Sequence, residues 1–372
     1  FRSKMKSKKK NPLLHLQKLK KKIKKNPKIN ALLVTAPSNL NYLTNSTLFS
    51  SSECDGIALI TPSQTFLFTS PLIYGQLQTE ASRSLRILLL KKKKELYRQL
   101  KSLIVDRRSP ITNYNFHLGF EENNLTYKQF KNLKKKLKIK LIPTKTIIEN
   151  LRIIKDKNEI KNIKKAVSLT KKAFKFIKKQ LKSGKIEKQI AWQMEKFFKE
   201  NGTDQLAFPI IVASGFNSAV PHHQASNRKL KKNDIVLIDA GCKINGYCSN
   251  MTRTFFIGKP RPEWKKVYEI VKSSQQKTLQ KVQPLTRNPK GGLNPISANQ
   301  LDKIARSHIK SCGYGKYFIH GLGHGIGLDI HEKPYISPKS KQTLRSCMAF
   351  TIEPGIYIPG KFGVRIEDVV IL

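Results

Sequence analysis

The sequence predicts a mixed α/β (α+β) fold in two domains, and three observations support this prediction. The chain has 372 residues, which is long enough for two or three domains with large cores. Between residues 31 and 142, short apolar strand patterns alternate with helical patterns, as in a compact α/β unit. After residue 156, long amphipathic helical patterns precede strand and hairpin patterns. We place the domain boundary after residue 147, so that the domains span residues 1–147 and 148–372.

The first domain begins with a basic segment, residues 1–25, in which Leu and Ile recur at helical spacing. We expect this helix to dock on its own domain, although such a stripe could also touch a membrane surface. A second helix is predicted to open near Ser38. The later elements of this domain are strands at 31–35, 55–61, 64–69, 85–90, 116–121 and 139–142, and helices at 72–83, 92–105 and 125–136.

The second domain follows a predicted linker at 143–156 and combines long helices with short buried strands. The pair Asn245-Gly246 predicts a two-residue hairpin turn. A Pro- and Gly-rich segment at 287–295 is interpreted as an inserted surface loop. The helices are predicted at 159–182, 186–200, 264–281 and 297–312, and the first strands at 209–215 and 235–238.

Charge and cysteine content limit the possible setting of the protein. Lys and Arg number 72 against 24 Asp and Glu, a formal net charge of +48. This charge suits either a solvated basic surface or an anionic partner such as nucleic acid. The five cysteines form no C-x-x-C pair, and no apolar run approaches the ~18 residues of a membrane span, so we expect a reduced, cytoplasmic protein without a membrane segment. The chain begins with Phe1 and could be a fragment.

The segment 317–332, Y-F-I-H-G-L-G-H-G-I-G-L-D-I-H-E, is the strongest functional signal. It places His320, His324 and His331 around four closely spaced glycines. Glycine lets a backbone pass close to another group, at a cost of roughly 0.5–1 kcal/mol per residue relative to Ala in regular structure. We therefore expect this segment to bring its histidines close to other functional groups.

Carboxylates elsewhere in the chain supply partners for these histidines. The hairpin turn should place Asp239 opposite Thr252, with Asn250 on the same face within about 7–8 Å. Glu353 and Glu367 lie in two further short apolar segments. Acids inside strands are costly unless they are paired or bound to a cation. An imidazole with several carboxylates suits a divalent metal, Mn²⁺ most naturally, with Co²⁺, Fe²⁺ or Zn²⁺ as alternatives.

These motifs, in this order, resemble the pita-bread metallopeptidases, and specifically the proline-specific branch of Xaa-Pro aminopeptidases and prolidases. The matching blocks are D-A-G, G-Y-C-S-N-M-T-R-T-F, H-G-L-G-H-G-I-G-L-D-I-H-E, T-I-E-P-G-I-Y and G-V-R-I-E-D. A weaker resemblance, in A-L-L-V-T-A-P-S-N-L-N-Y-L-T, is to a creatinase-type N-terminal domain. The resemblance implies a creatinase-like α/β domain before a pita-bread catalytic domain, proline-containing peptides as substrates, and a homodimer.

The resemblance also implies a site with two divalent metal ions and a metal-bridging hydroxide as the nucleophile. Its metal ligands would be Asp239, Asn250, His324, Glu353 and Glu367. The resemblance implies that His320 and His331 polarise the scissile carbonyl and that His222 contacts the proline side. Arg365 would orient Glu367 or the substrate. One glutamate, Glu353 or Glu367, would also move the proton.

Asn250 departs from the family pattern, which has a bridging Asp at this position. Two divalent ions ~3.5–4 Å apart repel by roughly 17–19 kcal/mol at an effective dielectric of 20, so bridging anions make the pair possible. A neutral amide oxygen bridges less well. We therefore expect one tight and one weak metal and reduced activity. The change could also be harmless, or inactivating in a chain no longer used for catalysis.

Two other functions remain open at this level. Pita-bread folds also occur as non-catalytic modules that bind proteins such as histones, and a basic chain with an altered ligand set could be one of them. A metal-free, creatinase-like hydrolase acting on a small guanidino substrate is the other. The presence of all the expected histidines favours the peptidase.

Overall fold

The computed structural model describes residues 14–50, 56–80, 85–105, 116–287 and 296–372. The chain divides into two compact units, Phe1–Leu151 and Arg152–Leu372, compared with a predicted boundary after residue 147. Within the described residues, no helix combines the length and the apolar character needed to cross a membrane.

The first unit contains a six-stranded mixed sheet in the order β4-β3-β2-β1-β5-β6. Its strands are β1 Ala31–Val34, β2 Gly56–Ile60, β3 Thr65–Thr69, β4 Arg86–Leu89, β5 His117–Glu121 and β6 Lys140–Thr144. The central strand β1 runs antiparallel to β2 and parallel to β5. All four β1 residues are buried, so both faces of the sheet are covered at its centre.

Helices between these strands supply the cover, and every strand predicted for this unit is confirmed. The helices are α1 Leu14–Lys24, α2 Pro37–Thr44, α3 Pro71–Glu80, α4 Lys93–Val105 and α5 Tyr127–Leu137. Residues of α4 and α5 share a core with Leu33 and Phe68 of the sheet. Part of the predicted N-terminal helix, residues 1–13, lies outside the described residues. The predicted linker at 143–156 is not irregular throughout, because β6 extends to Thr144 and a short helix, α6 Glu149–Arg152, follows.

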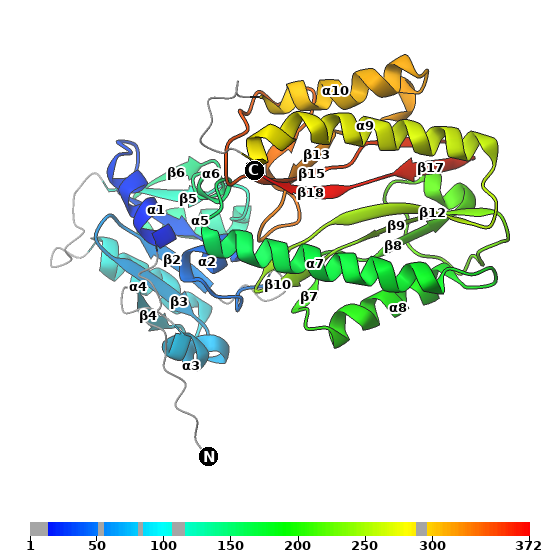
Figure 1. The fold of residues 1–372 in the computed structure, drawn as a ribbon. Coiled ribbons are helices and arrows are strands. Elements are labelled where there is room, and N and C mark those ends of the chain that lie inside the picture. Colours follow the sequence, from blue (N-terminus) through cyan, green and yellow to red (C-terminus); the bar gives the residue numbers. More distant parts are fainter. Residues whose placement is uncertain (1–13, 51–55, 81–84, 106–115, 288–295) are drawn as a thin grey trace. The chain divides into compact units, whose positions relative to one another are not determined.

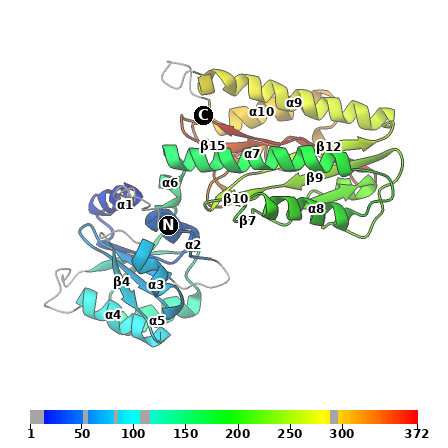
Figure 2. The ribbon, with the colours of Figure 1, turned by 60° about the horizontal axis from the view of Figure 1, so that its bottom comes forward.

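The second unit repeats one arrangement, two helices followed by antiparallel strands. In the first half, α7 Lys157–Gln180 and α8 Glu187–Glu200 precede β8 Ile211–Ser214, β9 Asp234–Ala240 and β12 Met251–Ile257. In the second half, α9 Pro262–Arg287 and α10 Ala298–Ser311 precede β13 Gly323–Gly325, β14 Glu332–Ile336, β15 Ala349–Ile352, β16 Gly355–Ile358, β17 Phe362–Arg365 and β18 Asp368–Ile371. Figures 1 and 2 show α7 and α8 on one side of these strands and α9 and α10 on the other.

Two apolar cores hold the helices against the strands. Apolar side chains of α7 and α8 pack on β8, β9 and β12, and those of α9 and α10 pack on the second set of strands. A smaller cluster of Ile211, Ala213, Leu237 and Tyr357 joins strands from both halves. The inner faces of the two strand sets therefore meet, and this is where a site between the halves can form.

The predicted hairpin is confirmed. Asn245 and Gly246 both have positive φ, 50° and 79°, as a type I′ turn requires, and they join β10 Cys242–Ile244 to β11 Tyr247–Cys248. A further short strand, β7 Gln205–Leu206, pairs with β10. In the longer pair, Thr252 lies opposite Asp239 as the register predicted. The helix predicted at 264–281 extends to Arg287, which is the first residue of the surface loop predicted at 287–295, and the rest of that loop lies outside the described residues.

The glycines of the histidine segment permit close backbone approach. Strand β13 lies between β14 and β15. A Cβ atom on Gly323 would lie 2.0 Å from the Thr351 carbonyl oxygen, and one on Gly325 would lie 2.3 Å from the Lys333 carbonyl oxygen. A side chain at either position would separate β13 from its neighbours, which explains why His324 is flanked by glycine.

We expect Gly323→Ala to destabilise the fold by roughly 1–3 kcal/mol, because the added methyl group overlaps a backbone oxygen that cannot move freely. Gly75→Ala is the matched control, since a Cβ there meets nothing within 4 Å in a helix. That control should stabilise by about 0.5–1 kcal/mol. Urea unfolding of both variants measures the difference, and equal midpoints would contradict the close approach.

Candidate active site

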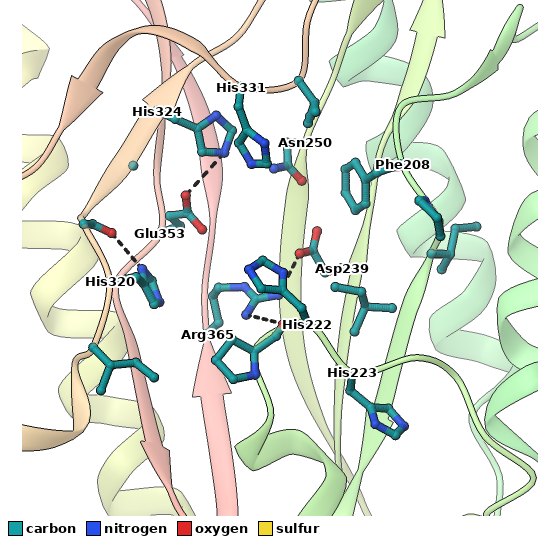
Figure 3. Close-up of a pocket in the computed structure, with 18 of the residues that line it drawn as sticks. Phe208, His222, His223, Asp239, Asn250, His320, His324, His331, Glu353 and Arg365 are labelled. Atoms are coloured by element: carbon teal, nitrogen blue, oxygen red, sulfur yellow. Dashed lines mark hydrogen bonds and ion pairs between the residues drawn. The ribbon is translucent and has the colours of Figure 1, made fainter. Parts of the chain in front are cut away.

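A cavity of about 1060 Å³ lies between the inner faces of the two strand sets in the second unit. Figure 3 shows the predicted residues pointing into it from both sides. The predicted site residues that line it are His222, Asp239, Asn250, His320, His324, His331, Glu353 and Arg365. Glu367 does not line the cavity, but its carboxylate lies within 4.8 Å of the ligand atoms of His324 and Glu353. The structure thus brings all nine predicted site residues together.

The two halves contribute opposite walls of the site. Asp239 belongs to β9, and Asn250 directly precedes β12, with which β9 is paired. Glu353 directly follows β15. The walls are joined where the Glu367 amide donates to the Thr252 carbonyl oxygen (3.1 Å) and the Thr252 hydroxyl donates to the Glu367 carboxylate (2.7 Å).

His324, Glu353 and Glu367 form a compact group with the chemistry of a metal site. The His324 Nδ1–H donates to the Gly325 carbonyl oxygen (3.1 Å), which leaves the Nε2 lone pair facing Glu353 at 3.4 Å. Thr351 orients both residues, because its hydroxyl accepts from the His324 amide (3.0 Å) and donates to Glu353 (3.2 Å). One ring nitrogen and two carboxylates therefore converge on one point.

Buried oxygens around this group lack hydrogen-bond partners. Within the described part of the chain, Asp239 Oδ1, Asn250 Oδ1 and Glu367 Oε1 are buried and accept no hydrogen bond. Leaving buried polar atoms unpaired is costly, so such atoms usually have a bound partner. Oxygen donors with one imidazole suit divalent cations. The residues present therefore fit bound divalent metal ions.

Burial shifts the proton affinity of the carboxylates. It raises the pKa of Asp239, although the neighbouring Arg365 opposes this shift. Burial also raises the pKa of Glu353 to about 8, again against Arg365. The pKa of Glu367 is raised well above its usual value by burial and by the charges of Glu353 and Asp239. Three acids in one buried site resist ionising together unless a cation joins them.

Arg365 contacts the opposite wall. Its Nη2 forms an ion pair with Asp239 Oδ2 (2.6 Å), and its Nε donates to the Thr252 hydroxyl (3.0 Å). Burial by itself would lower the pKa of Arg365. Tyr357 and the neighbouring carboxylates raise this pKa by a larger amount, so the net shift is upward and the guanidinium stays charged. Among the described residues its ion pair is with Asp239, and the orienting of Glu367 or the substrate by Arg365 stays a prediction. Thr252, lying opposite Asp239, connects Arg365 to Glu367.

Tyr357 belongs to the hydrogen-bond network of the site, and sequence reasoning missed it. Its hydroxyl accepts from Arg365 Nη1 (2.8 Å) and donates to His320 Nε2 (3.0 Å). The His320 Nδ1–H donates to the Gly321 carbonyl oxygen (2.7 Å). Burial lowers the pKa of His320 to about 4 and raises that of Tyr357 to about 12, so both are neutral. The available signal was the final Tyr of T-I-E-P-G-I-Y, in the same motif as Glu353.

His331 and His222 complete the polar wall. The His331 ring stands edge-on to His324, with ring centroids 4.3 Å apart. Burial lowers the pKa of His331, and the nearby His222 lowers it further. Burial lowers the pKa of His324 to about 4. Electrostatic repulsion between the two imidazoles, when His331 is protonated, acts in the same direction. His324 and His331 are therefore neutral near pH 7, and neutral imidazole is the form that ligates a metal.

Charged side chains hold the ends of the histidine segment. The residue after His331 is Glu332, whose carboxylate pairs with Lys155 Nζ (2.7 Å) and with Arg152. At the other end, Arg306 of α10 donates to the carbonyl oxygen of His320 (2.7 Å). The segment is thus fixed on both sides of β13.

Apolar residues from both halves of the unit also line the cavity. Phe208, Pro209, Ile210 and Ile319 line the same cavity. Sequence reasoning did not single out these residues, since apolar residues in and beside strands are ordinary. The cavity can therefore hold a ligand with both an apolar and a polar part.

Comparison with known proteins places the chain in a family. Residues 161–372 match metallopeptidase family M24, and residues 15–154 match the creatinase/prolidase N-terminal domain. The chain is 36% identical over 345 residues to the Xaa-Pro dipeptidase of Pyrococcus horikoshii, covering 92% of this chain and 90% of the relative.

Solved structures agree. The Xaa-Pro dipeptidase from Bacillus anthracis superposes with a TM-score of 0.85 at 32% identity, covering 97% of this chain and 95% of that one. The X-Pro aminopeptidase from Thermotoga maritima gives a TM-score of 0.79 at 32% identity, covering 92% and 93%. The expected fold, a creatinase-like domain before a pita-bread catalytic domain, is confirmed. The chain belongs to metallopeptidase family M24.

Proposed function

We propose that this protein hydrolyses the peptide bond that precedes proline, as an Xaa-Pro dipeptidase or Xaa-Pro aminopeptidase. The observation that carries the proposal is the group of His324, Glu353 and Glu367 beside the unpaired oxygens of Asp239 and Asn250. Similarity to Xaa-Pro dipeptidases over most of the chain supports the proline-directed reaction. The binding-module and metal-free alternatives are not favoured, because this group is intact.

Divalent metal ions would be held by His324, Glu353 and Glu367 on one side and by Asp239 and Asn250 on the other. We propose Mn²⁺ from the mixture of carboxylate and imidazole ligands. When bound, such ions activate a water molecule and polarise a carbonyl group.

The chain's own residues would orient the substrate and move the proton. Glu353 would move the proton, because a carboxylate beside the activated water can accept a proton and return it. Neutral His331 can hydrogen-bond to the scissile carbonyl. The His320 Nε2 accepts the Tyr357 hydroxyl proton, so His320 would polarise the carbonyl only in a complex in which this hydrogen bond is broken and Nε2 carries a proton. His222 would contact the proline side of the substrate.

Asn250 would make the two metal positions unequal. The position served by His324, Glu353 and Glu367 keeps two carboxylates. At the other position, Asp239 already shares one oxygen with Arg365, and the Asn250 amide brings no charge. We propose that the first position binds metal tightly and the second weakly, with reduced activity.

Three further proposals rest on sequence arguments. We propose a homodimer from the family resemblance, and a cytoplasmic location from the cysteine pattern. The +48 charge is consistent with non-specific binding of anionic polymers, and equally with a solvated basic surface. None of these affects the assignment of the site.

With Mn²⁺, the protein should cleave Xaa-Pro substrates and leave the same peptides with Ala in place of Pro intact. Cleavage of dipeptides alone would identify a dipeptidase, and cleavage of Xaa-Pro-Xaa peptides an aminopeptidase. Liquid chromatography of the products measures this. His324→Ala is the inactive control, because it removes a metal ligand. Equal cleavage of the Pro and Ala peptides would remove the proline-specific assignment.

Calorimetric titration with Mn²⁺ should find one tight and one weak metal in the natural chain and two tight metals in Asn250→Asp, which restores a bridging anion. The matched control is Asn245→Asp, the same chemical change in the exposed turn, and it should behave like the natural chain. Two equally tight metals in the natural chain would contradict the argument.

Metal binding should release protons, and the number should depend on pH. Glu353 has a folded pKa of about 8 raised by burial, so it is largely protonated at pH 7 and ionised at pH 9. Titration in buffers of different ionisation enthalpy should therefore find about 0.8 more proton released by Glu353 at pH 7 than at pH 9. The raised pKa also means that the metal-free fold gains stability from Glu353 that is complete below about pH 4.3 and is lost as the pH rises through 8. Equal proton release at both pH values would contradict the buried, protonated Glu353.

A further inference from the structure

The ring of His222 projects from a loop that is held at Pro221 and at His223, the residues on either side of it. The loop follows β8 and contains the short helix η1 Gly215–Ala219 and the sequence Pro221-His222-His223. Figure 3 shows the His222 and His223 rings pointing in different directions, His222 toward Asp239 and Arg365 and His223 away from them. His222 is close enough to Asp239 and His331 to influence the pKa of each.

Glu187, in the first turn of α8, anchors the base of this loop. Its side chain is fully buried. Oε1 accepts from the amide of Ser214 (2.7 Å) and from the Ser214 hydroxyl (2.6 Å), at the end of β8. Oε2 accepts from the amide of Ser226 (3.0 Å) and from the Ser226 hydroxyl (2.6 Å). One carboxylate therefore joins the two ends of the loop.

The same carboxylate reaches the interior of the loop. His223 Nε2 donates to Glu187 Oε2 (2.9 Å), and the Asn217 side-chain amide donates to Oε1 (3.0 Å). Burial raises the pKa of Glu187, but the hydrogen bonds from Ser214, Ser226, Asn217 and His223 lower it to about 2. The anchor is thus a charged acceptor, which makes its hydrogen bonds stronger than those of a neutral group.

The opposite side of the loop is anchored to the active-site wall. Arg365 Nη1 donates to the Pro221 carbonyl oxygen (3.3 Å), and the Gly363 amide donates to the Ser218 hydroxyl (2.9 Å). A Cβ atom on Gly363 would lie 2.1 Å from the Ser218 carbonyl oxygen, so η1 lies directly on β17. The residue before His222 is therefore held by the active site, and the residue after it by Glu187.

We propose that Glu187, acting through His223, is a positioning residue that sets the place of the His222 ring in the cavity. This inference rests on the proposed function, in which His222 contacts the proline side of the substrate. Glu187 itself does not line the cavity. Its effect is to fix the loop backbone on one side while Arg365 fixes it on the other, so that the His222 side chain has one direction in which to project.

The test uses three variants and one control in the full-length, Mn²⁺-loaded protein. His223→Ala removes the donor from a half-buried side chain, and His223→Gln keeps an N–H donor. Glu187→Gln keeps the shape but removes the charge. Glu195→Gln is the control, because Glu195 is on the same helix and, among the described residues, forms its ion pair with the exposed Lys199.

Two readouts separate positioning from general stability. The KM and kcat of an Xaa-Pro dipeptide report substrate binding and turnover. Modification of His222 by diethylpyrocarbonate, followed by peptide mass spectrometry, reports its surroundings without requiring any activity. Calorimetric Mn²⁺ affinity shows whether the metal centre is intact.

His223→Ala and Glu187→Gln should raise KM roughly tenfold or more and change the rate of His222 modification at least about threefold, with unchanged Mn²⁺ affinity. His223→Gln should recover most of both effects, and Glu195→Gln should show neither. Unchanged KM and His222 reactivity in His223→Ala would overturn the inference. So would a Glu187→Gln variant that loses Mn²⁺ affinity while His223→Ala behaves normally. If the natural chain cleaves no Xaa-Pro substrate, the proposed function fails, while the His222 reactivity still decides whether Glu187 positions the loop.

Discussion

The site depends on one electrostatic constraint, the burial of three carboxylates with a single guanidinium. Asp239, Glu353 and Glu367 approach one another, and Arg365 is engaged by Asp239. Burial raises the pKa of each acid, so the group is poorly compensated while it is ionised. Added cations relieve this excess of negative charge, and the unpaired buried oxygens give them direct ligands. The affinity for divalent ions therefore follows from the fold that forces these acids together.

The fold achieves this by facing one half of the catalytic unit against the other. Strands β9 and β12 come from the first half, and β13, β15 and β17 come from the second. A continuous chain of contacts crosses between them, from Asp239 through Arg365 and Tyr357 to His320. Because both halves hold parts of this chain, a shift of either sheet would alter the acids, the guanidinium and the imidazole together. The same coupling extends to the His222 loop, since Arg365 also holds Pro221.

Much of this arrangement could be predicted from local patterns. The Asn245-Gly246 turn determines the register of the hairpin, and the period of two then places Asp239 opposite Thr252. The alternating glycines around His324 indicated close backbone contact, which β13 shows against both neighbours. Helix ends and the strands of the first unit also followed from capping and periodicity. These features are local, because each depends on residues close together in sequence.

What the sequence by itself determined is which residues meet in the candidate site, the strand register and the type of each element. Only the tertiary structure decided which groups pair across the site. The sequence placed Arg365 near Glu367, two residues away, whereas the fold pairs it with Asp239, 126 residues distant. The contacts of Tyr357 and Glu187 were not predicted from the sequence for the same reason, because their partners come from distant strands and loops. Local periodicity predicts which face of a strand or helix a side chain occupies. The partner that it meets on that face depends on how separate elements pack, which is a property of the whole chain.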